Sequence, residues 1–263
     1  MAKIIAFFSA WLLAWLPIAI PLARRLHWQP FTPLAIAQKL PLVLSLYAIV
    51  PFLLGATIVL EQVSPSVYGI AWNSSVLVSL VTGLSLAIAG VALLFGLEVA
   101  LGWVEWRSPD LTTVASIATN WVLPLGLGLV IGAIEEAVFR GFLLTQLQQE
   151  VSWWIAAVIS SLVFALLHLV WDSKALPQLP GLGLMGLVLV LARWLDGGSL
   201  GVPWGLHAGW IWAMASLDAA GAISYRDRAP VWLTGFAGQP LAGGLGLLLL
   251  LLTGGVVWSI RGG

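Results

Sequence analysis

Residues 117–144 read IATNWVLPLGLGLVIGAIEEAVFRGFLL, and this stretch decides the class of fold. It is long enough to cross the hydrocarbon core of a bilayer, which takes about 20 mostly apolar residues. It nevertheless carries three charged residues, Glu135, Glu136 and Arg140. An ionisable group inside a span costs about 2.5–3.5 kcal/mol on insertion scales, so such groups are functional candidates by default. We therefore expect a membrane-spanning helix with a polar site built into it.

The rest of the chain has the same apolar character. Of its 263 residues, 60% are hydrophobic and only 8% are charged, whereas soluble domains carry about a quarter charged residues. The sequence therefore predicts an all-α fold, a polytopic transmembrane helical bundle of about eight spans, in a single membrane domain over residues 1–263. The expected spans are Ile4–Leu22, Leu40–Leu60, Val76–Leu101, Ile117–Leu144, Val151–Val170, Leu179–Leu195, Leu200–Leu217 and Leu241–Ile260.

Composition excludes several classes of function and suggests an orientation. Eleven basic and eleven acidic residues leave no net charge, so there is no electrostatic case for binding nucleic acid. The absence of Cys excludes disulfides, thiolate metal sites and a Cys nucleophile. We expect a multi-pass protein of a plasma or inner membrane, with the lipid bilayer as its partner. Arg24, Arg107 and Arg226 lie in odd-numbered loops and Arg193 in an even-numbered one; the excess in odd-numbered loops predicts that these are cytoplasmic.

Helical spacing separates the two central carboxylates. Gly128, Gly132, Glu136 and Arg140 recur every four residues and share one face, where the small residues let a neighbouring helix approach closely. Glu136 and Arg140 are then an i,i+4 ion pair with a supporting role. Glu135 is rotated by about 100° from this stripe. A buried carboxylate without a partner is protonated or meets a partner from another helix.

Two of the three His residues fall within expected spans and are the obvious partners. His168 ends the segment Phe164-Ala-Leu-Leu-His168, and His207 lies between Gly205 and Gly209. A carboxylate with two imidazoles can bind a divalent metal ion or polarise a water molecule directly. The residues themselves leave both interpretations open.

Three motifs follow one another on consecutive hydrophobic segments: Glu135-Glu136-x-x-x-Arg140, Phe164-x-x-x-His168 and His207. In this order they resemble the CAAX-processing and bacteriocin-processing intramembrane proteases, the CPBP or Abi family. The resemblance covers about residues 111–217, which would be the catalytic core. It implies an endopeptidase that hydrolyses a peptide bond of a membrane-associated protein or peptide.

The resemblance also implies roles for the individual residues. Glu135 would be the general base on the attacking water, His168 would help to hold that water, and His207 would stabilise the oxyanion. Glu135, His168 and His207 would alternatively be three ligands of a divalent metal such as zinc, with the fourth position open. The cofactor stays undecided at this point. The supporting residues would be Glu136, Arg140 and Phe164.

One position departs from the family's pattern. Family members usually carry Asn or a similar polar residue four positions after the last motif His, and here that residue is Ile211. Loss of an oxyanion donor costs about 3–4 kcal/mol in comparable sites. Three outcomes stay open: weaker activity, a donor from elsewhere, or a protein without proteolytic activity that serves as a membrane scaffold or binding protein. A proton-coupled carrier is disfavoured, because the sequence has no inverted repeat and no paired broken helices.

Overall fold

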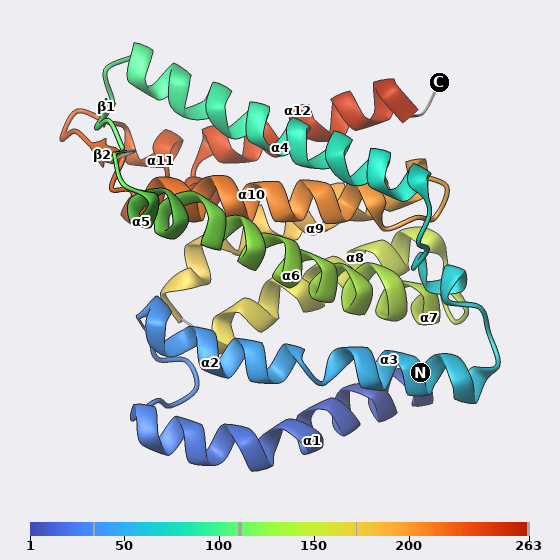
Figure 1. The fold of residues 1–263 in the computed structure, drawn as a ribbon. Helices are drawn as coiled ribbons and strands as arrows, with labels where there is room; N and C mark the ends of the chain where they lie inside the picture. Colours follow the sequence, from blue (N-terminus) through green and yellow to red (C-terminus); the bar gives the residue numbers. More distant parts are fainter. Residues whose placement is uncertain (34, 110–111, 172, 262–263) are drawn as a thin grey trace.

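The computed structural model describes residues 1–33, 35–109, 112–171 and 173–261, and in this part of the chain the long helices lie side by side in one bundle (Figure 1). The two termini lie at the same end of the bundle, as an even number of crossings requires. The longer helices are α1 (Ala2–Leu26), α2 (Ile36–Tyr47), α3 (Val50–Glu61), α4 (Ser74–Ala100), α6 (Leu123–Glu136), α8 (Trp153–Leu167), α9 (Leu179–Leu195), α10 (Gly201–Ala219) and α12 (Gly244–Arg261).

The shorter elements join these helices at the two ends of the bundle. Strands β1 (Val104–Trp106) and β2 (Ile223–Tyr225) pair antiparallel and connect the ends of α4 and α10. Helices α5 (Val114–Ile117) and α7 (Leu144–Gln148) extend α6 in both directions, and α11 (Val231–Thr234) precedes α12.

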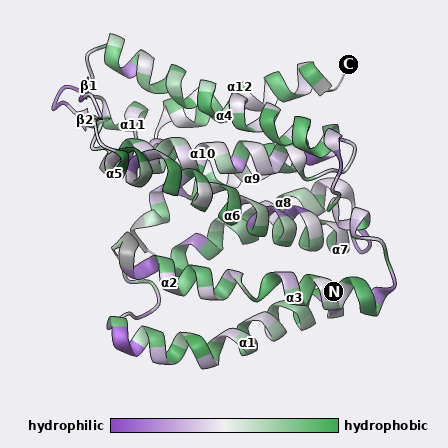
Figure 2. Cartoon of the chain, viewed as in Figure 1, coloured by the Kyte–Doolittle hydropathy of each residue, from purple (hydrophilic) through white to green (hydrophobic). Residues whose placement is uncertain are grey.

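The expected class of fold is confirmed. Six helical segments of the described chain are long and apolar enough to cross a membrane, and a shorter apolar one follows at Gly244–Ile260. Figure 2 shows hydrophobic residues along the helices, while hydrophilic ones gather mainly at the loops. Large apolar side chains such as Phe52 and Leu93, which are 79% and 74% exposed, face outward. A bilayer supplies the apolar surroundings that these side chains require.

The segment 200–217 is helical as expected, but its helix, α10, is less apolar than the six because it carries glycines, a His and several Trp residues. It runs through the centre of the bundle against α4 and α6. A Cβ atom on Gly128 would lie 2.8 Å from the Ala208 carbonyl oxygen, and one on Gly132 would lie 3.2 Å from the Ala208 nitrogen. The expected close approach along the glycine stripe is therefore present, and it brings α10 onto the face of α6 that carries Glu136.

Helix α6 continues as a π-helical segment, Ala137–Leu143, before α7 begins. Glu135 and Glu136 are the last two residues of regular α-helix before this change. Such π segments interrupt α-helices frequently at functional sites. The change of winding therefore falls where the charged residues are.

Candidate active site

Glu136 and Arg140 form the ion pair that their spacing predicts. Arg140 Nη1 lies 2.9 Å from Glu136 Oε1, and both side chains are fully buried. The guanidinium also donates from Nη2 to the Gly186 carbonyl at 3.3 Å. Its central carbon lies 4.4 Å from the centre of the Phe164 ring, within the range of a cation–π contact. Phe164 therefore supports the site through its ring, as well as by its place on α8.

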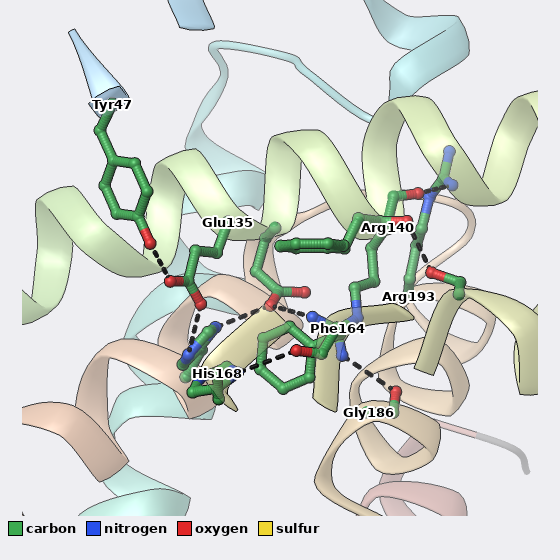
Figure 3. A network of polar contacts seen from close by, with 11 residues as sticks. Tyr47, Glu135, Arg140, Phe164, His168, Gly186 and Arg193 are labelled. Atoms are coloured by element: carbon green, nitrogen blue, oxygen red, sulfur yellow. Dashed lines mark hydrogen bonds and ion pairs between the residues drawn. The ribbon is translucent and has the colours of Figure 1, made fainter. Parts of the chain in front are cut away.

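His207 connects the two carboxylates (Figure 3). Its Nδ1 lies 2.8 Å from Glu136 Oε1, and its Nε2 lies 3.5 Å from Glu135 Oε2. An imidazole with a proton on each nitrogen would donate in both directions. The prediction that Glu135 meets a partner from another helix is confirmed for His207.

His168 approaches from the end of α8. Its Nδ1 lies 2.8 Å from the carbonyl oxygen of Phe164. A carbonyl oxygen can only accept, so Nδ1 carries the proton, and Nε2 of the neutral ring is left as an acceptor. The Phe164 ring packs between the two imidazoles, with its centre 4.8 Å from that of His168 and 5.7 Å from that of His207. Phe164 thereby sets the positions of both rings.

Tyr47, at the end of α2, is the residue that the sequence analysis missed. Its hydroxyl donates a hydrogen bond to Glu135 Oε1 (Figure 3), across a separation of 88 residues. The interruption of the helix between α2 and α3 has a local cause. Pro51 lacks the N–H that would bond to the Tyr47 carbonyl, and its ring crowds that carbonyl. The sequence signal that could have identified Tyr47 is a tyrosine inside an expected span, four residues before a proline.

Glu135, Phe164, His168 and His207 lie on the wall of one cavity of about 790 Å³, within the size range of ligand-binding sites. The three predicted catalytic residues line it together with Tyr47 and Ile211, and most of the remaining wall is apolar. Glu135 is 9% exposed, whereas Glu136 is 0% exposed. The carboxylate that reaches the cavity is therefore Glu135, as the helical spacing predicts.

The arrangement does not fit a three-ligand metal site. In the described ranges, no three His, Cys, Asp or Glu residues come together in a group that could hold a metal ion. Glu135 is hydrogen-bonded by Tyr47, while Glu136 Oε1 and His207 Nδ1 are engaged with each other. The predicted zinc set of Glu135, His168 and His207 is thus not supported by the geometry of the described residues.

The structure buries two further charged side chains. Arg193, expected in a loop, is only 7% exposed and donates to the carbonyl oxygens of Arg140 and Gly198. Its assignment to a loop was wrong, because the guanidinium folds back beneath the end of α9. Glu98, near the end of α4, is fully buried beside Tyr225.

Fold and site together define a class: multi-pass membrane proteins that hold a carboxylate–imidazole cluster beside a cavity among their spans. Residues 117–213 match the sequence model of the family described as type II CAAX prenyl endopeptidase Rce1-like. The resemblance to CAAX-processing proteases is thereby confirmed, and it supports a membrane protease of the CAAX type. Searches of curated proteins and of solved structures gave no significant match.

Proposed function

We propose that the protein is an intramembrane endopeptidase of the CAAX- and bacteriocin-processing type, which hydrolyses a peptide bond of a membrane-associated protein or peptide in a plasma or inner membrane. The observation that carries the proposal is the convergence of Glu135, His168 and His207 on the wall of one cavity. The three come from α6, α8 and α10, so the packing of the bundle creates the site. The matched segment, residues 117–213, contains all three.

Glu135 and His168 hold and activate the water molecule. The water donates one hydrogen bond to Glu135 and another to the unprotonated Nε2 of His168, both of which face the cavity. Glu135 takes the proton as the water oxygen adds to the carbonyl carbon of the substrate. General base catalysis of this kind contributes about 10²–10⁴-fold to a rate.

His207 stabilises the negative charge that appears on the substrate oxygen. Glu136 fixes the ring by accepting from Nδ1 at 2.8 Å, which leaves Nε2 directed towards the cavity side of Glu135. Arg140 holds Glu136 in turn at 2.9 Å. The intermediate then collapses: the carbon–nitrogen bond breaks, Glu135 delivers its proton to the leaving amine, and the acyl part leaves as a carboxylic acid.

The apolar wall supports a substrate with an apolar segment. Trp11, Phe139, Leu182 and Met185 belong to this wall, and they come from three helical segments of the bundle: α1, the π-helical segment after α6, and α9. An apolar chain or lipid group would gain about 25 cal/mol for each Å² of apolar surface removed from water. We therefore propose membrane-associated substrates over freely soluble ones.

The test uses purified protein in proteoliposomes with internally quenched peptides, made with and without a C-terminal prenyl-Cys motif. Glu135→Ala and His168→Ala should lower kcat/KM by at least about 10²-fold. The matched control is Glu150→Ala, since this carboxylate is 49% exposed and pairs with the N-terminus away from the cavity. Unchanged cleavage in both site variants would sink the proposal.

Metal dependence needs a separate measurement. Because the donor geometry does not fit a metal ion, we expect activity to survive dialysis against a strong chelator. Elemental analysis of the same samples would show whether any transition metal remains. Loss of activity on chelation, with recovery on adding zinc, would contradict this expectation and restore the metal interpretation.

A scaffold or binding function is the second candidate, and Ile211 is the observation that favours it, because the cavity wall lacks a polar group at this position. In that case Glu135→Gln leaves the cellular phenotype intact. A bulky substitution at Gly132, where the backbone of α10 lies within contact distance, would abolish it.

A further inference from the structure

We propose that the Tyr47 hydroxyl is a catalytic group, the second hydrogen-bond donor to the substrate oxyanion, in place of the polar side chain that Ile211 does not supply. The inference rests on the proposed peptidase function. Three observations carry it: the contact between Tyr47 and Glu135, the position of Ile211, and the polar groups of the cavity wall.

Tyr47 and His207 approach the same carboxylate from two sides. The Tyr47 hydroxyl donates to Oε1 of Glu135, and His207 Nε2 lies 3.5 Å from Oε2. Figure 3 shows the Tyr47 phenol beside the Glu135 carboxylate. A carbonyl group attacked by a water molecule that Glu135 holds must lie within a few ångströms of Glu135. It is therefore within reach of both donors.

The proton movements are consistent with this role. In the resting site, the negative charge of Glu135 is stabilised by Tyr47 and His207. When Glu135 takes a proton from water, that charge leaves the carboxylate and appears on the substrate oxygen. Tyr47 and His207 keep their own protons and exchange one acceptor for the other. A donor aimed at the place where charge develops lowers the barrier without reorganisation.

Ile211 cannot serve as the second oxyanion donor on α10, because its side chain carries no polar group. It lies one helical turn after His207, lines the cavity, and has no donor. Among the described residues that line the cavity, Tyr47 carries the only hydroxyl group. Trp210 also lines the cavity, and in the described chain its indole N–H has no hydrogen-bond partner, but this nitrogen is shut off from the cavity surface. Trp210 therefore offers no donor at the cavity surface.

The position of Tyr47 is fixed by the chain itself. The hydroxyl is carried by the last residue of α2, where Pro51 ends the helix. The side chain is only 8% exposed, and it belongs to the main hydrophobic core. A donor held in this way does not need to be ordered when the substrate binds. The matched family segment, residues 117–213, does not include it.

The experiment compares Tyr47→Phe, the control Tyr225→Phe and the double variant Tyr47→Phe/Ile211→Asn in the proteoliposome assay, on the peptide that the wild type cleaves. Tyr47→Phe should lower kcat by about 10²–10³-fold, the effect of losing one oxyanion donor, with KM changed less than about threefold. Tyr225→Phe should stay close to wild type, because this phenol does not line the cavity. The double variant should recover at least about tenfold over Tyr47→Phe, because the introduced amide would restore a donor on α10.

A binding measurement covers the case in which the double variant does not fold. A phosphinate analogue of the cleaved peptide, which mimics the tetrahedral intermediate, should bind Tyr47→Phe more weakly by the same factor as kcat/KM falls. The uncleaved peptide, measured on a Glu135→Gln background, should bind with unchanged affinity. Equal weakening of both ligands would overturn the proposal, since it would show a general effect on the cavity.

Two kinetic outcomes would also overturn it. One is wild-type activity in Tyr47→Phe. The other is a loss without rescue by Ile211→Asn, together with a shift of the acidic limb of the kcat/KM pH profile, since Tyr47 would then act through Glu135 as a positioning residue. If Glu135→Gln is as active as wild type, the peptidase function itself has failed, and that result is distinct from either of these.

Discussion

The cavity at the centre of the bundle and the corner beneath the β1–β2 ribbon each hold a buried glutamate beside a tyrosine. In the cavity, Glu135 accepts from Tyr47 and faces His207, and it is 9% exposed. In the corner, Glu98 adjoins Tyr225 and is fully buried, and neither of its oxygens has a hydrogen bond of good geometry in the described chain. The difference teaches that burial of a carboxylate in a span does not define a site. A site is defined by access of the carboxylate to a cavity and by its imidazole partners.

Removing the two carboxylates is the most direct way to break this comparison. Glu135→Gln should lower kcat/KM by about 10²–10⁴-fold, because the general base is lost while the shape of the side chain is kept. Glu98→Gln should leave kcat/KM within about threefold of wild type, because Glu98 does not line the cavity. The measurement is the proteoliposome assay on both variants at one pH. Equal losses in the two would show that the corner contributes to the chemistry.

The buried Glu136–Arg140 pair should contribute far more to the free energy of unfolding than the partly exposed Lys3–Glu61 pair. Arg140→Met removes the guanidinium partner of the buried Glu136, so we expect a loss of about 3–5 kcal/mol. Lys3→Ala breaks the Lys3–Glu61 pair, which spans 3.0 Å but has Lys3 58% exposed. That change should cost about 0–1 kcal/mol. Reversible unfolding in mixed detergent micelles measures both.

A double variant separates charge from geometry in this pair. Glu136→Leu/Arg140→Met removes both buried charges, and it should be less unstable than Arg140→Met alone. It should nonetheless be inactive, because His207 loses the acceptor of its Nδ1 proton. If the double variant were as unstable as Arg140→Met, the stability effect would come from packing against Phe164 and not from the unpaired carboxylate.

One glycine of α10 and one of α4 offer a comparison within the fold itself. A Cβ atom on Gly205 would lie 2.7 Å from the Leu84 nitrogen and closer still to the Leu80 carbonyl, whereas one on Gly96 would meet nothing within 4 Å. Gly205→Ala should therefore destabilise by about 1–3 kcal/mol and lower activity by displacing His207. Gly96→Ala should stabilise by about 0.5–1 kcal/mol, since α4 gains a better helix former. Thermal midpoints of both, with activity at a permissive temperature, test this.

Much of the fold could be predicted because membrane spans are long, continuous and apolar. The helical period alone predicted the ion pair of Glu136 and Arg140. It also predicted that Glu135 points away from the face that carries this pair. That period is a local property, so a sequence displays it directly. The contact of α6 with α10 through Gly128 and Gly132 was readable for the same reason.

The missed features depend on packing between segments that are distant in the chain. Tyr47 contacts Glu135 only because the tertiary structure brings the end of α2 next to α6. The two residues are 88 positions apart in the sequence. Arg193 lies at a span end, where a long side chain can reach water or fold back, and the acceptors that draw it inward come from another helix. Neither choice is encoded by spacing on the helix itself. Buried partners of this kind need the tertiary structure.

Tyr68, the third tyrosine, also lies beside a glutamate: its hydroxyl donates to Glu61 at the end of the bundle, outside the cavity. Its replacement should have the smallest effect on activity. Burial, and then the hydrogen bond to Glu61, raise the pKa of Tyr68 to about 12. A phenol whose folded-state pKa lies above its ordinary value near 10 stabilises the fold fully below about pH 10. This contribution is lost as the pH rises through about 12. Tyr68→Phe should cost about 1 kcal/mol at about pH 8, and its deficit relative to wild type should shrink between about pH 10 and pH 12, with kcat/KM unchanged throughout. A deficit that stayed constant with pH would mean that this phenol does not titrate in the range, and a fall in kcat/KM would mean that a tyrosine–glutamate pair can serve the site without reaching its cavity.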